Sequence, residues 1–476
     1  MVSPARTSGV LQPAARGIMP LLVTAFIGLS LAGFLSVFPQ RYSDFRAFYC
    51  SGRVVLAGAD PYREEPLHAC EHSLQSRLLS PLPAQVTIPA PYPGYVLAIF
   101  SFVARLPFEP AAIAWTLASC LALAAAIVMV ARSTAVRLPA VAAVLGFPAA
   151  VVALPLGQPT IFVLCALAGC AMLLRAGRPR QAALAALATT LDPHVGLAVC
   201  AGLFLAVAEA RVVLVAGGIG VLAASAAAYG PAREWEYLHD VLPLHAFVNV
   251  PEYSQFSLAN LAFTAGLPAG PAVVLGNAWY ALSVVAGVVA ALRLRAGLGV
   301  AAVPYVPVAF AVFGGAHTHL QQLALAVPAF LLVTSAATGY RRAVLVGATF
   351  AAAMPWLVAA PFPYLFLATA VLGVAFVRCS GAAPFGLAIG AGSLCILLVL
   401  FVAVALANAP AIPVAVAHSG NPLAEVAWGS FVAATSLPAQ AWYLAAKIPT
   451  LLGFTAMLGA ILDAARAASL RLAPAL

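Results

Sequence analysis

The sequence contains few charged residues. Asp, Glu, Lys and Arg make up 8% of its 476 residues, whereas soluble domains carry about 25%. Lysine occurs once, and the arginines are scattered, so the chain lacks the basic stripe of a nucleic-acid-binding protein. Hydrophobic residues make up 64%, which is more apolar surface than a soluble core can bury. The composition therefore excludes a soluble domain and a nucleic-acid partner, and it indicates an integral protein of the lipid bilayer.

The apolar residues form runs that approach the length a helix needs to cross a bilayer. We predict an all-α membrane protein, a polytopic helical bundle with about 13–14 transmembrane helices, several of them near or above the roughly 20 residues that cross a bilayer. The predicted spans are 19–38, 111–131, 138–155, 159–174, 181–192, 195–208, 212–229, 271–292, 298–315, 320–338, 343–359, 362–377, 385–407 and 441–464.

The placement of arginine predicts the topology. If Tyr92–Phe108 crosses the membrane, most arginine-rich turns fall outside; if this stretch stays at the outer face, most of the 23 basic residues fall inside. Positive charge concentrates on the cytoplasmic side, which favours the second arrangement. Scarce lysine and abundant alanine are typical of GC-rich bacterial genomes. We therefore expect a multi-pass protein of the bacterial inner membrane with a cytoplasmic amino terminus.

This topology divides the chain into three parts. Residues 1–18 form the cytoplasmic amino terminus, and residues 19–210 form a catalytic module that includes the long first outer loop 39–110. Residues 211–476 form a carboxy-terminal transmembrane bundle with outer loops 230–271 and 408–440. Acidic residues and histidines gather in the outer gaps. Ionisable groups cost free energy near lipid, so their clustering predicts an active site at the outer face.

Asp44 is the candidate general base. It lies just after the first predicted span, where partial desolvation raises a carboxylate's pKa and a helix end fixes its position. The alternative is an acid paired with Arg46 or Arg41. Asp60 lies in a turn that precedes Pro61, and turn formation alone also explains it.

Further candidates interrupt other apolar runs. Asp192 and His194 flank a proline and could simply form a satisfied pair. His317 and His319 share a face only in an extended turn. Zinc binding is open to them, but no third ligand is adjacent, which favours hydrogen bonding to a phosphate or a sugar hydroxyl. Gln322 follows in the same polar segment. For Cys50 and Cys70, a disulfide and two free thiols both remain open.

Several motifs together resemble glycosyltransferase family 87, whose members are polytopic and have the GT-C fold. Asp44–Gly52 and Leu56–Tyr62 resemble the opening of that family. Ala90–Gly94 resembles its Tyr-Pro-Pro element, with Gly94 in place of the second proline, and Leu156–Thr160 resembles its Gly-Gln-x-Asn/Ser/Thr element. The sequence departs from the family at Asp192, where a lysine often precedes the proline.

The resemblance implies transfer of a hexose, typically mannose, from a polyprenyl-phosphate donor to a glycolipid or glycan acceptor, with inversion. It implies that Asp44 is the base and that no bound nucleotide or obligatory metal is needed. The expected ligands of the leaving phosphate are Arg46, His194 and His319. The residues expected to orient or bind the sugar or acceptor are Tyr49, Asp60, Tyr62, Tyr92, Gln158, Asp192, His317 and Gln322. A transporter or flippase of an anionic glycolipid, and a membrane scaffold without catalytic activity, are the alternatives.

Overall fold

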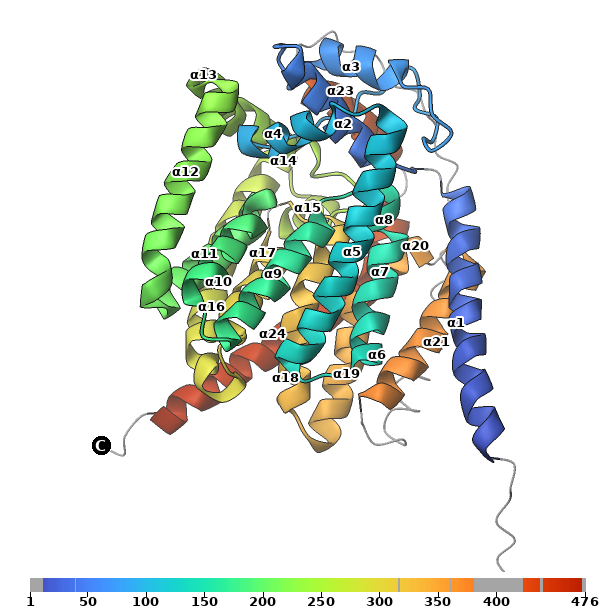
Figure 1. The fold of residues 1–476 in the computed structure, drawn as a ribbon, viewed down its shortest axis with the longest axis vertical. Helices are drawn as coiled ribbons and strands as arrows, with labels where there is room; N and C mark the ends of the chain where they lie inside the picture. The colour runs from blue at the N-terminus through green and yellow to red at the C-terminus, as the bar shows by residue number, and fades with distance from the viewer. Residues whose placement is uncertain are drawn as a thin grey trace, which may run out of the picture.

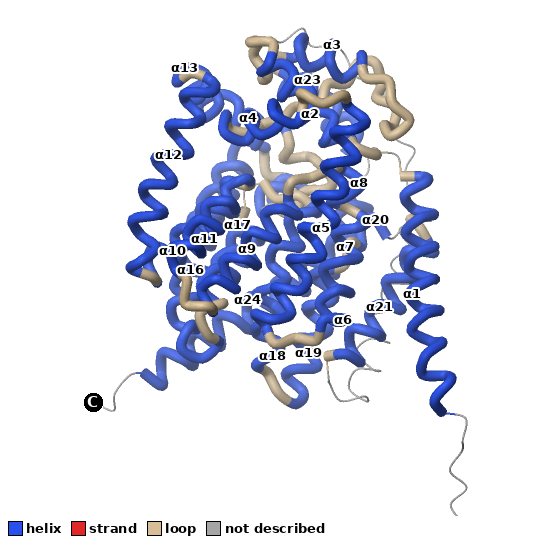
Figure 2. Tube along the Cα trace, in the orientation of Figure 1, coloured by secondary structure: helices blue, strands red, loops and turns tan. Residues whose placement is uncertain are grey.

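The computed structural model describes residues 12–38, 40–315, 317–359, 361–380, 423–436 and 440–472. Over these ranges every regular element is a helix, as Figure 2 shows. The strand-like pairings among these residues are two isolated bridges, Arg63 with Leu423 and Gln255 with His319. The prediction of an all-α polytopic membrane protein is confirmed.

The body of the protein is a bundle of helices (Figure 1). Its elements are α1 (Gln12–Val37), α5 (Phe108–Thr134), α6 (Leu138–Val141), η1 (Ala142–Gly146), α7 (Phe147–Val151), α8 (Ala153–Leu156), α9 (Thr160–Arg175), α10 (Pro179–Ala188), η2 (Thr189–Leu191), α11 (Pro193–Ala206), η3 (Ala208–Ala210), α12 (Arg211–Tyr229), α16 (Ala269–Leu298), α17 (Ala302–Gly314), η5 (Leu320–Ala326), α18 (Val327–Ala336), α19 (Gly339–Ala353), α20 (Trp356–Ala359), α21 (Pro363–Cys379) and α24 (Gln440–Leu472). The largest hydrophobic core lies between them and includes the fully buried rings of Tyr305, Phe330 and Phe454.

Five stretches in the described part of the chain are long and apolar enough to cross a bilayer. They are Phe108–Thr134, Leu138–Leu156, Ala208–Tyr229, Ala269–Leu298 and Ala446–Ser469. Other apolar helices, such as α9, α11, α17 and α21, are shorter. The count of 13–14 crossings stays a prediction, and the predicted span 385–407 and most of loop 408–440 lie outside the described residues.

The long polar segments are not simple loops. The elements within them are α2 (Ser43–Leu56), α3 (Glu64–Ser73), α4 (Gly94–Val103), α13 (Pro231–Glu236), η4 (Tyr237–Val241), α14 (Leu242–Val248), α15 (Leu258–Thr264) and α23 (Ala424–Ser436). Apart from α15, they gather at one end of the bundle, at the top of Figure 1. The ten-residue helix α4 lies at this end and packs against α2 and α12, so the stretch Tyr92–Phe108 does not run through the bundle.

Arginines lie at the opposite end of the bundle. Arg175 ends α9, and Arg132, Arg295 and Arg378 lie in the last turns of α5, α16 and α21. These helix ends lie at the bottom of Figure 1, away from α2, α3 and α4. The protein therefore has a polar, helix-capped end, which carries Arg46 and Arg63, and an opposite end where four helices of the bundle finish at or near an arginine. Which end faces the cytoplasm stays a prediction.

Candidate active site

Asp44 lies in the first turn of α2 and is partly buried. Its Oδ2 atom accepts a hydrogen bond from the Gln158 side-chain amide, and its Oδ1 atom accepts one from the Ser43 hydroxyl at 2.9 Å. Gln158 is 9% exposed. The predicted base and one predicted sugar-orienting residue are therefore in direct contact, although 114 positions separate them.

Gly157 explains how Gln158 reaches Asp44. It ends α8 with φ +76°, a left-handed conformation that glycine adopts without the penalty of a Cβ atom. A Cβ atom at Gly157 would lie 2.5 Å from the Cβ atom of Phe45, the residue after Asp44. The chain turns sharply there and α9 begins two residues after Gln158, so its side chain projects from a tight junction toward α2.

Asp192 is the centre of a second group of contacts. It precedes α11, and its side chain is 10% exposed. Its Oδ1 atom lies 2.8 Å from His194 Nδ1, and its Oδ2 atom accepts a hydrogen bond of 2.7 Å from Gln322 Nε2. His194 Nε2 is buried and has no hydrogen-bond partner within the described part of the chain. This nitrogen is available to a ligand, because a buried polar group without a partner is costly.

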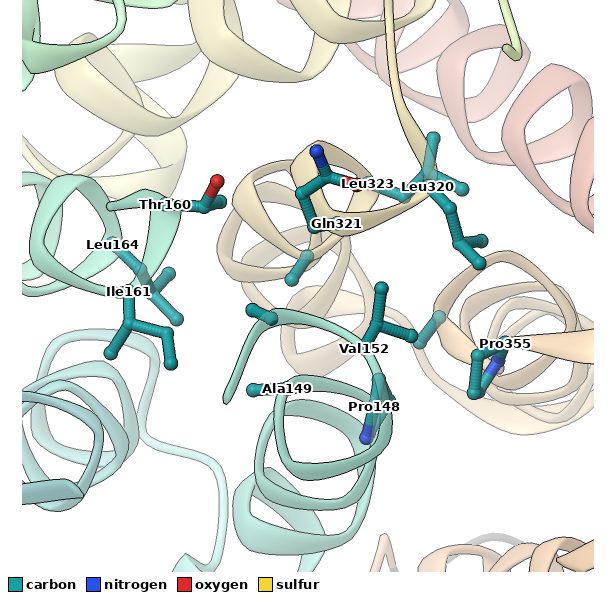
Figure 3. A pocket seen from close by; sticks show the side chains of 13 residues that line it. Pro148, Ala149, Val152, Thr160, Ile161, Leu164, Leu320, Gln321, Leu323 and Pro355 are labelled. Carbon is teal, nitrogen blue, oxygen red and sulfur yellow. The ribbon is translucent and has the colours of Figure 1, made fainter. Parts of the chain in front are cut away.

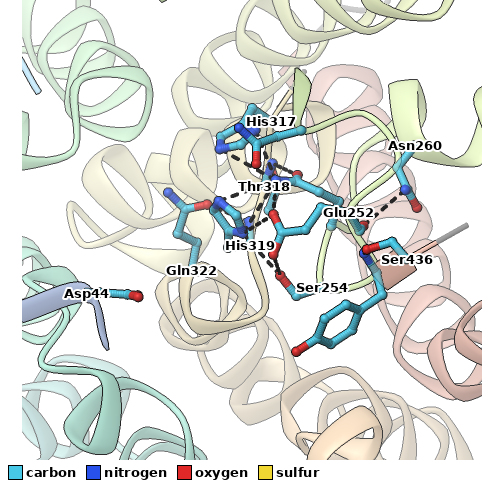
Figure 4. Close-up of polar contacts among 12 residues, drawn as sticks. Asp44, Glu252, Ser254, Asn260, His317, Thr318, His319, Gln322 and Ser436 are labelled. Carbon is cyan, nitrogen blue, oxygen red and sulfur yellow. Dashed lines mark hydrogen bonds and ion pairs between the residues drawn. The ribbon is translucent and has the colours of Figure 1, made fainter. Parts of the chain in front are cut away.

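Gln322 links Asp192 to the histidine segment. The Gln322 side-chain carbonyl accepts a bond of 2.8 Å from the backbone N–H of His319, and His319 caps η5. His319 Nδ1 lies 3.3 Å from Glu252 Oε2 and 3.2 Å from the Ser254 hydroxyl. Figure 4 shows this cluster with the Asp44 carboxylate pointing toward it from the opposite side.

His317 belongs to the same cluster. The His317 and His319 rings meet edge to face with centroids 4.4 Å apart, so the extended segment does place them side by side. His317 Nδ1 lies 2.9 Å from the Gln255 amide nitrogen, and His317 Nε2 lies 3.1 Å from His245 Nε2. His245 Nδ1 in turn lies 2.8 Å from Glu425 Oε2. These contacts join segments that are remote in sequence into one polar network.

Burial gives the two aspartates different pKa shifts. Burial raises the pKa of Asp44, against the hydrogen bonds from Gln158 and Ser43. Burial also acts on Asp192, but the charge and hydrogen bond of His194 outweigh it and lower the pKa of Asp192. Where two neighbouring carboxylates have pKa values shifted in opposite directions, they typically have different roles in acid–base chemistry. Asp44 suits proton acceptance, and Asp192 suits a fixed negative charge.

Two further groups respond to this environment. Burial raises the pKa of Tyr92 well above its usual value, and the charges of Asp192 and Asp44 raise it further. Tyr92 therefore lies within electrostatic reach of both carboxylates. Burial and the neighbouring imidazoles of His319 and His245 hold the pKa of His317 well below its usual value.

Arg46 and Tyr49 point elsewhere. The Arg46 guanidinium donates to the backbone carbonyl of Ser80 and is buried. Its charge also acts on the Glu71 carboxyl. Burial raises the pKa of Glu71 to about 8, although a hydrogen bond from the Ile88 amide and the charge of Arg46 both favour the ionised form. The Tyr49 hydroxyl donates to the carbonyl of Leu106 at 2.8 Å. Neither of these side chains has a contact with the Asp44 group among the described interactions.

Asp60 and Tyr62 contribute to structure around the site. Asp60 accepts a bond from the Tyr62 backbone N–H and pairs with Arg63 at 3.1 Å, as the turn interpretation predicts. The Tyr62 hydroxyl donates to the carbonyl of Tyr92 at 2.8 Å, and its ring stacks on Tyr237. Tyr62 therefore fixes the position of the Tyr92 backbone.

Gly94 accounts for one departure from the family pattern. Its backbone N–H donates to Glu234 Oε1 at 2.8 Å, a bond that proline could not make. Ser225 donates to the same oxygen at 2.7 Å and accepts from the Tyr95 backbone N–H at 2.8 Å. Glu234 and Ser225 thus fix the start of α4 next to α12, immediately after Tyr92.

Four network residues carry no signal in the sequence. They are His245, Glu252, Gln255 and Glu425, and all lie in segments that the sequence predicts as polar loops. Asn260 holds one of these segments, since its amide donates to the carbonyls of Val250 at 2.7 Å and Glu252 at 3.2 Å. The Asn260 carbonyl accepts a 2.8 Å bond from buried Lys447 of α24. The segment that carries Glu252 is thereby attached to α24 of the bundle.

The question left open for Cys50 and Cys70 is answered by the structure. They form a disulfide that joins α2 to α3. Disulfides persist in oxidising compartments and are rare in the cytosol. The bond also fixes the helix that carries Asp44.

A small apolar cavity of about 20 Å³ lies near the polar cluster (Figure 3). Pro148, Ile161, Leu320, Gln321 and Pro355 are among its lining residues. Its volume is close to that of a single water molecule, so it cannot hold a sugar. The substrate-binding candidates are instead the polar groups between Asp44 and the histidine segment.

Comparison with known proteins gives one match. The family model of glycosyltransferase family 87 matches residues 91–315. This range contains Gln158, Asp192, His194 and the short helices before α16. None of the curated proteins and none of the solved structures matches the chain.

Proposed function

We propose that this chain, whose residues 91–315 match the model of glycosyltransferase family 87, is a membrane glycosyltransferase that moves a hexose from a polyprenyl-phosphate donor to a glycan or glycolipid acceptor. Mannose is the sugar we expect from the resemblance. The reaction is a single displacement that inverts the anomeric carbon. The observation that carries this proposal is the Asp44 carboxylate, which Gln158 and Ser43 hold opposite the Asp192–Gln322–His319 group.

Asp44 is the proposed general base. An acceptor hydroxyl gives its proton to Asp44 while its oxygen attacks the anomeric carbon, and the bond from that carbon to the phosphate oxygen breaks. Burial raises the pKa of Asp44, and a base with a higher pKa takes a proton more readily in the transition state. Gln158 keeps the carboxylate oriented, because its amide donates to one carboxylate oxygen.

The leaving phosphate binds on the histidine side. Negative charge builds up on this group as the glycosidic bond breaks, and fixed donors nearby lower the barrier. His194 Nε2 is buried and unpartnered among the described residues, and His194 Nδ1 is held by Asp192. We assign the phosphate to His194 and His319. Arg46, the third ligand expected from the sequence, donates to the Ser80 carbonyl, so we leave it outside the proposed phosphate site.

The remaining candidates surround the transferred sugar. Tyr92 is within electrostatic reach of Asp44 and Asp192, so its hydroxyl is the proposed contact to a sugar or acceptor hydroxyl. His317 and Gln322 position the phosphate side through their contacts with Gln255 and Asp192.

We place this site at the outer face of the bacterial inner membrane. Two observations support that side. Arginines lie at the far end of the bundle, and positive charge concentrates in the cytoplasm. The Cys50–Cys70 disulfide at the site's end suits an oxidising compartment.

The test uses the purified full chain in liposomes with polyprenyl-phospho-mannose and a panel of glycan and glycolipid acceptors. We expect polyprenyl phosphate to be released in step with a glycosylated acceptor of inverted configuration. Turnover with a nucleotide sugar and none with the lipid donor would contradict the donor assignment. Movement of the intact labelled lipid across the bilayer without cleavage would support a flippase instead.

A further inference from the structure

Three histidine side chains converge beside the proposed active site. His245 comes from the end of α14, and His317 and His319 come from the segment between α17 and η5. One nitrogen of each lies within 4.8 Å of the other two. His245 Nε2 and His317 Nε2 are 3.1 Å apart. In a tetrahedral zinc site with bonds of about 2.0–2.1 Å, neighbouring nitrogens are about 3.3 Å apart. We propose that His245, His317 and His319 bind a divalent transition-metal ion of the zinc class.

Carboxylates hold two of these imidazoles in an orientation that suits metal binding. His245 Nδ1 lies 2.8 Å from Glu425 Oε2, and His319 Nδ1 lies 3.3 Å from Glu252 Oε2. A carboxylate at Nδ1 attracts the ring proton and leaves the lone pair of Nε2 free. Histidines that bind metals almost always donate their other nitrogen to such a partner. Each of the two histidine–carboxylate pairs therefore leaves its Nε2 atom as the nitrogen for a metal, although His319 Nε2 also lies 3.3 Å from the Gln255 amide nitrogen.

The charge around the cluster also suits a cation. The side chains of Glu425 and Glu252 are only 2% and 12% exposed. A buried carboxylate needs a compensating charge, and the ion-pair partners of Glu425 and Glu252 among the described residues are the imidazoles of His245 and His319. A divalent ion bound to neutral imidazoles would balance the charge of these two carboxylates. Three protein ligands leave the fourth position of a tetrahedral ion open to water or to the leaving phosphate, which His319 would then reach through the ion and not by a direct hydrogen bond.

A hydrogen-bonded chain without metal is the competing arrangement. The Gln255 carbonyl accepts a 2.8 Å bond from the Thr318 backbone N–H, so its amide nitrogen faces His317 Nδ1 at 2.9 Å. His317 Nε2 could then donate to His245 Nε2, and His245 to Glu425. If this hydrogen-bonded arrangement is correct, the imidazoles remain in contact and no ion binds. A measurement of metal content distinguishes it from the metal site.

The experiment measures metal content and needs no substrate, so its outcome is independent of the proposed transfer reaction. The full chain is purified in detergent by a tag that contains no histidine, equilibrated with zinc(II), passed through gel filtration and analysed by mass spectrometry. We expect one equivalent of zinc per chain. His317→Ala should lose it. His239→Ala is the matched control, because His239 is exposed and meets the Trp235 ring edge to face, and it should keep the ion.

Cobalt(II) and a second variant keep the test decisive if His317→Ala does not fold. Cobalt(II) in the wild-type chain should give the strong visible absorption of a tetrahedral site. Glu425→Gln keeps the shape of the side chain and should weaken zinc affinity by roughly 10–100-fold, as removal of a supporting carboxylate does elsewhere. A wild-type chain that retains no zinc and shows no tetrahedral cobalt spectrum would overturn the proposal, as would a folded His317→Ala chain that retains a full equivalent.

Discussion

Replacing Gln322 by leucine tests whether the candidate site works as one connected unit. The Gln322 side chain donates to Asp192 Oδ2 at 2.7 Å and accepts from the His319 backbone N–H at 2.8 Å. Leucine has a similar size but can form neither bond. The change therefore separates the Asp192–His194 pair from the histidine segment while leaving every proposed chemical group in place.

The expected effect follows from the two bonds. A hydrogen bond to an ionised carboxylate contributes about 1.5–3 kcal/mol, and one between neutral groups about 0.5–1.5 kcal/mol. Their loss amounts to about 2–4.5 kcal/mol. If all of it falls on the transition state, kcat/KM drops by roughly 30- to 2,000-fold. We expect a drop toward the lower end, since part of the loss destabilises the free protein as well.

The assay is release of polyprenyl phosphate together with thermal unfolding in the same detergent. Gln321→Leu is the matched control, because Gln321 is equally buried at 9% exposure and lines the apolar cavity. It should retain activity. If Gln321→Leu and Gln322→Leu lose the same activity at the same Tm, the contacts of Gln322 have no special role and the connected-site reasoning fails.

Three other predictions concern the support of Asp44. Asp44→Asn should melt at a higher temperature than wild type at neutral pH, because burial raises the pKa of Asp44 and so disfavours its ionised form. This gain should shrink as the pH falls through the raised pKa of the folded protein and vanish well below the ordinary value of 3.8, where the aspartate is protonated in both states; a variant that is less stable at neutral pH would contradict it. Replacing Cys50 and Cys70 by serine should cost about 3 kcal/mol for a loop of this length, measured as a lower Tm, whereas an unchanged Tm would show that the disulfide does not constrain α2. Gly157→Ala should lower both Tm and turnover, because it forces a left-handed alanine against Phe45, and wild-type values for both would show that the junction has room.

The sequence predicts the part of the site that interrupts apolar runs. Asp44, Gln158, Asp192 and His319 each stand between hydrophobic stretches, where polar residues are costly and therefore informative. His245 and Glu425 lie in polar segments, where one more polar residue carries no signal. Their pairing at 2.8 Å depends on α14 and α23 coming together, and no local pattern encodes this contact.

Arg46 shows a second reason why the sequence alone does not predict the whole site. Residues two apart on a helix point in different directions, so Arg46 could not share the direction of Asp44 once α2 had formed. The sequence presents this stretch as part of a polar loop, and a helix there is not predicted. The helix directs the Arg46 guanidinium to the Ser80 carbonyl, and its role as a phosphate ligand stays a prediction. The same holds for the outer segments in general: their short helices decide which side chains meet.

The central claim is that Asp44 takes the proton of the acceptor, and single-turnover transfer by Asp44→Asn tests it most directly. Asp240→Asn is the control, because Asp240 is exposed at the same end of the protein. With equal amounts of folded protein and saturating lipid donor, we predict that Asp44→Asn slows transfer by roughly 10²–10⁴-fold, the usual contribution of a general base, and that Asp240→Asn transfers at the wild-type rate. Transfer by Asp44→Asn at the wild-type rate would contradict the account.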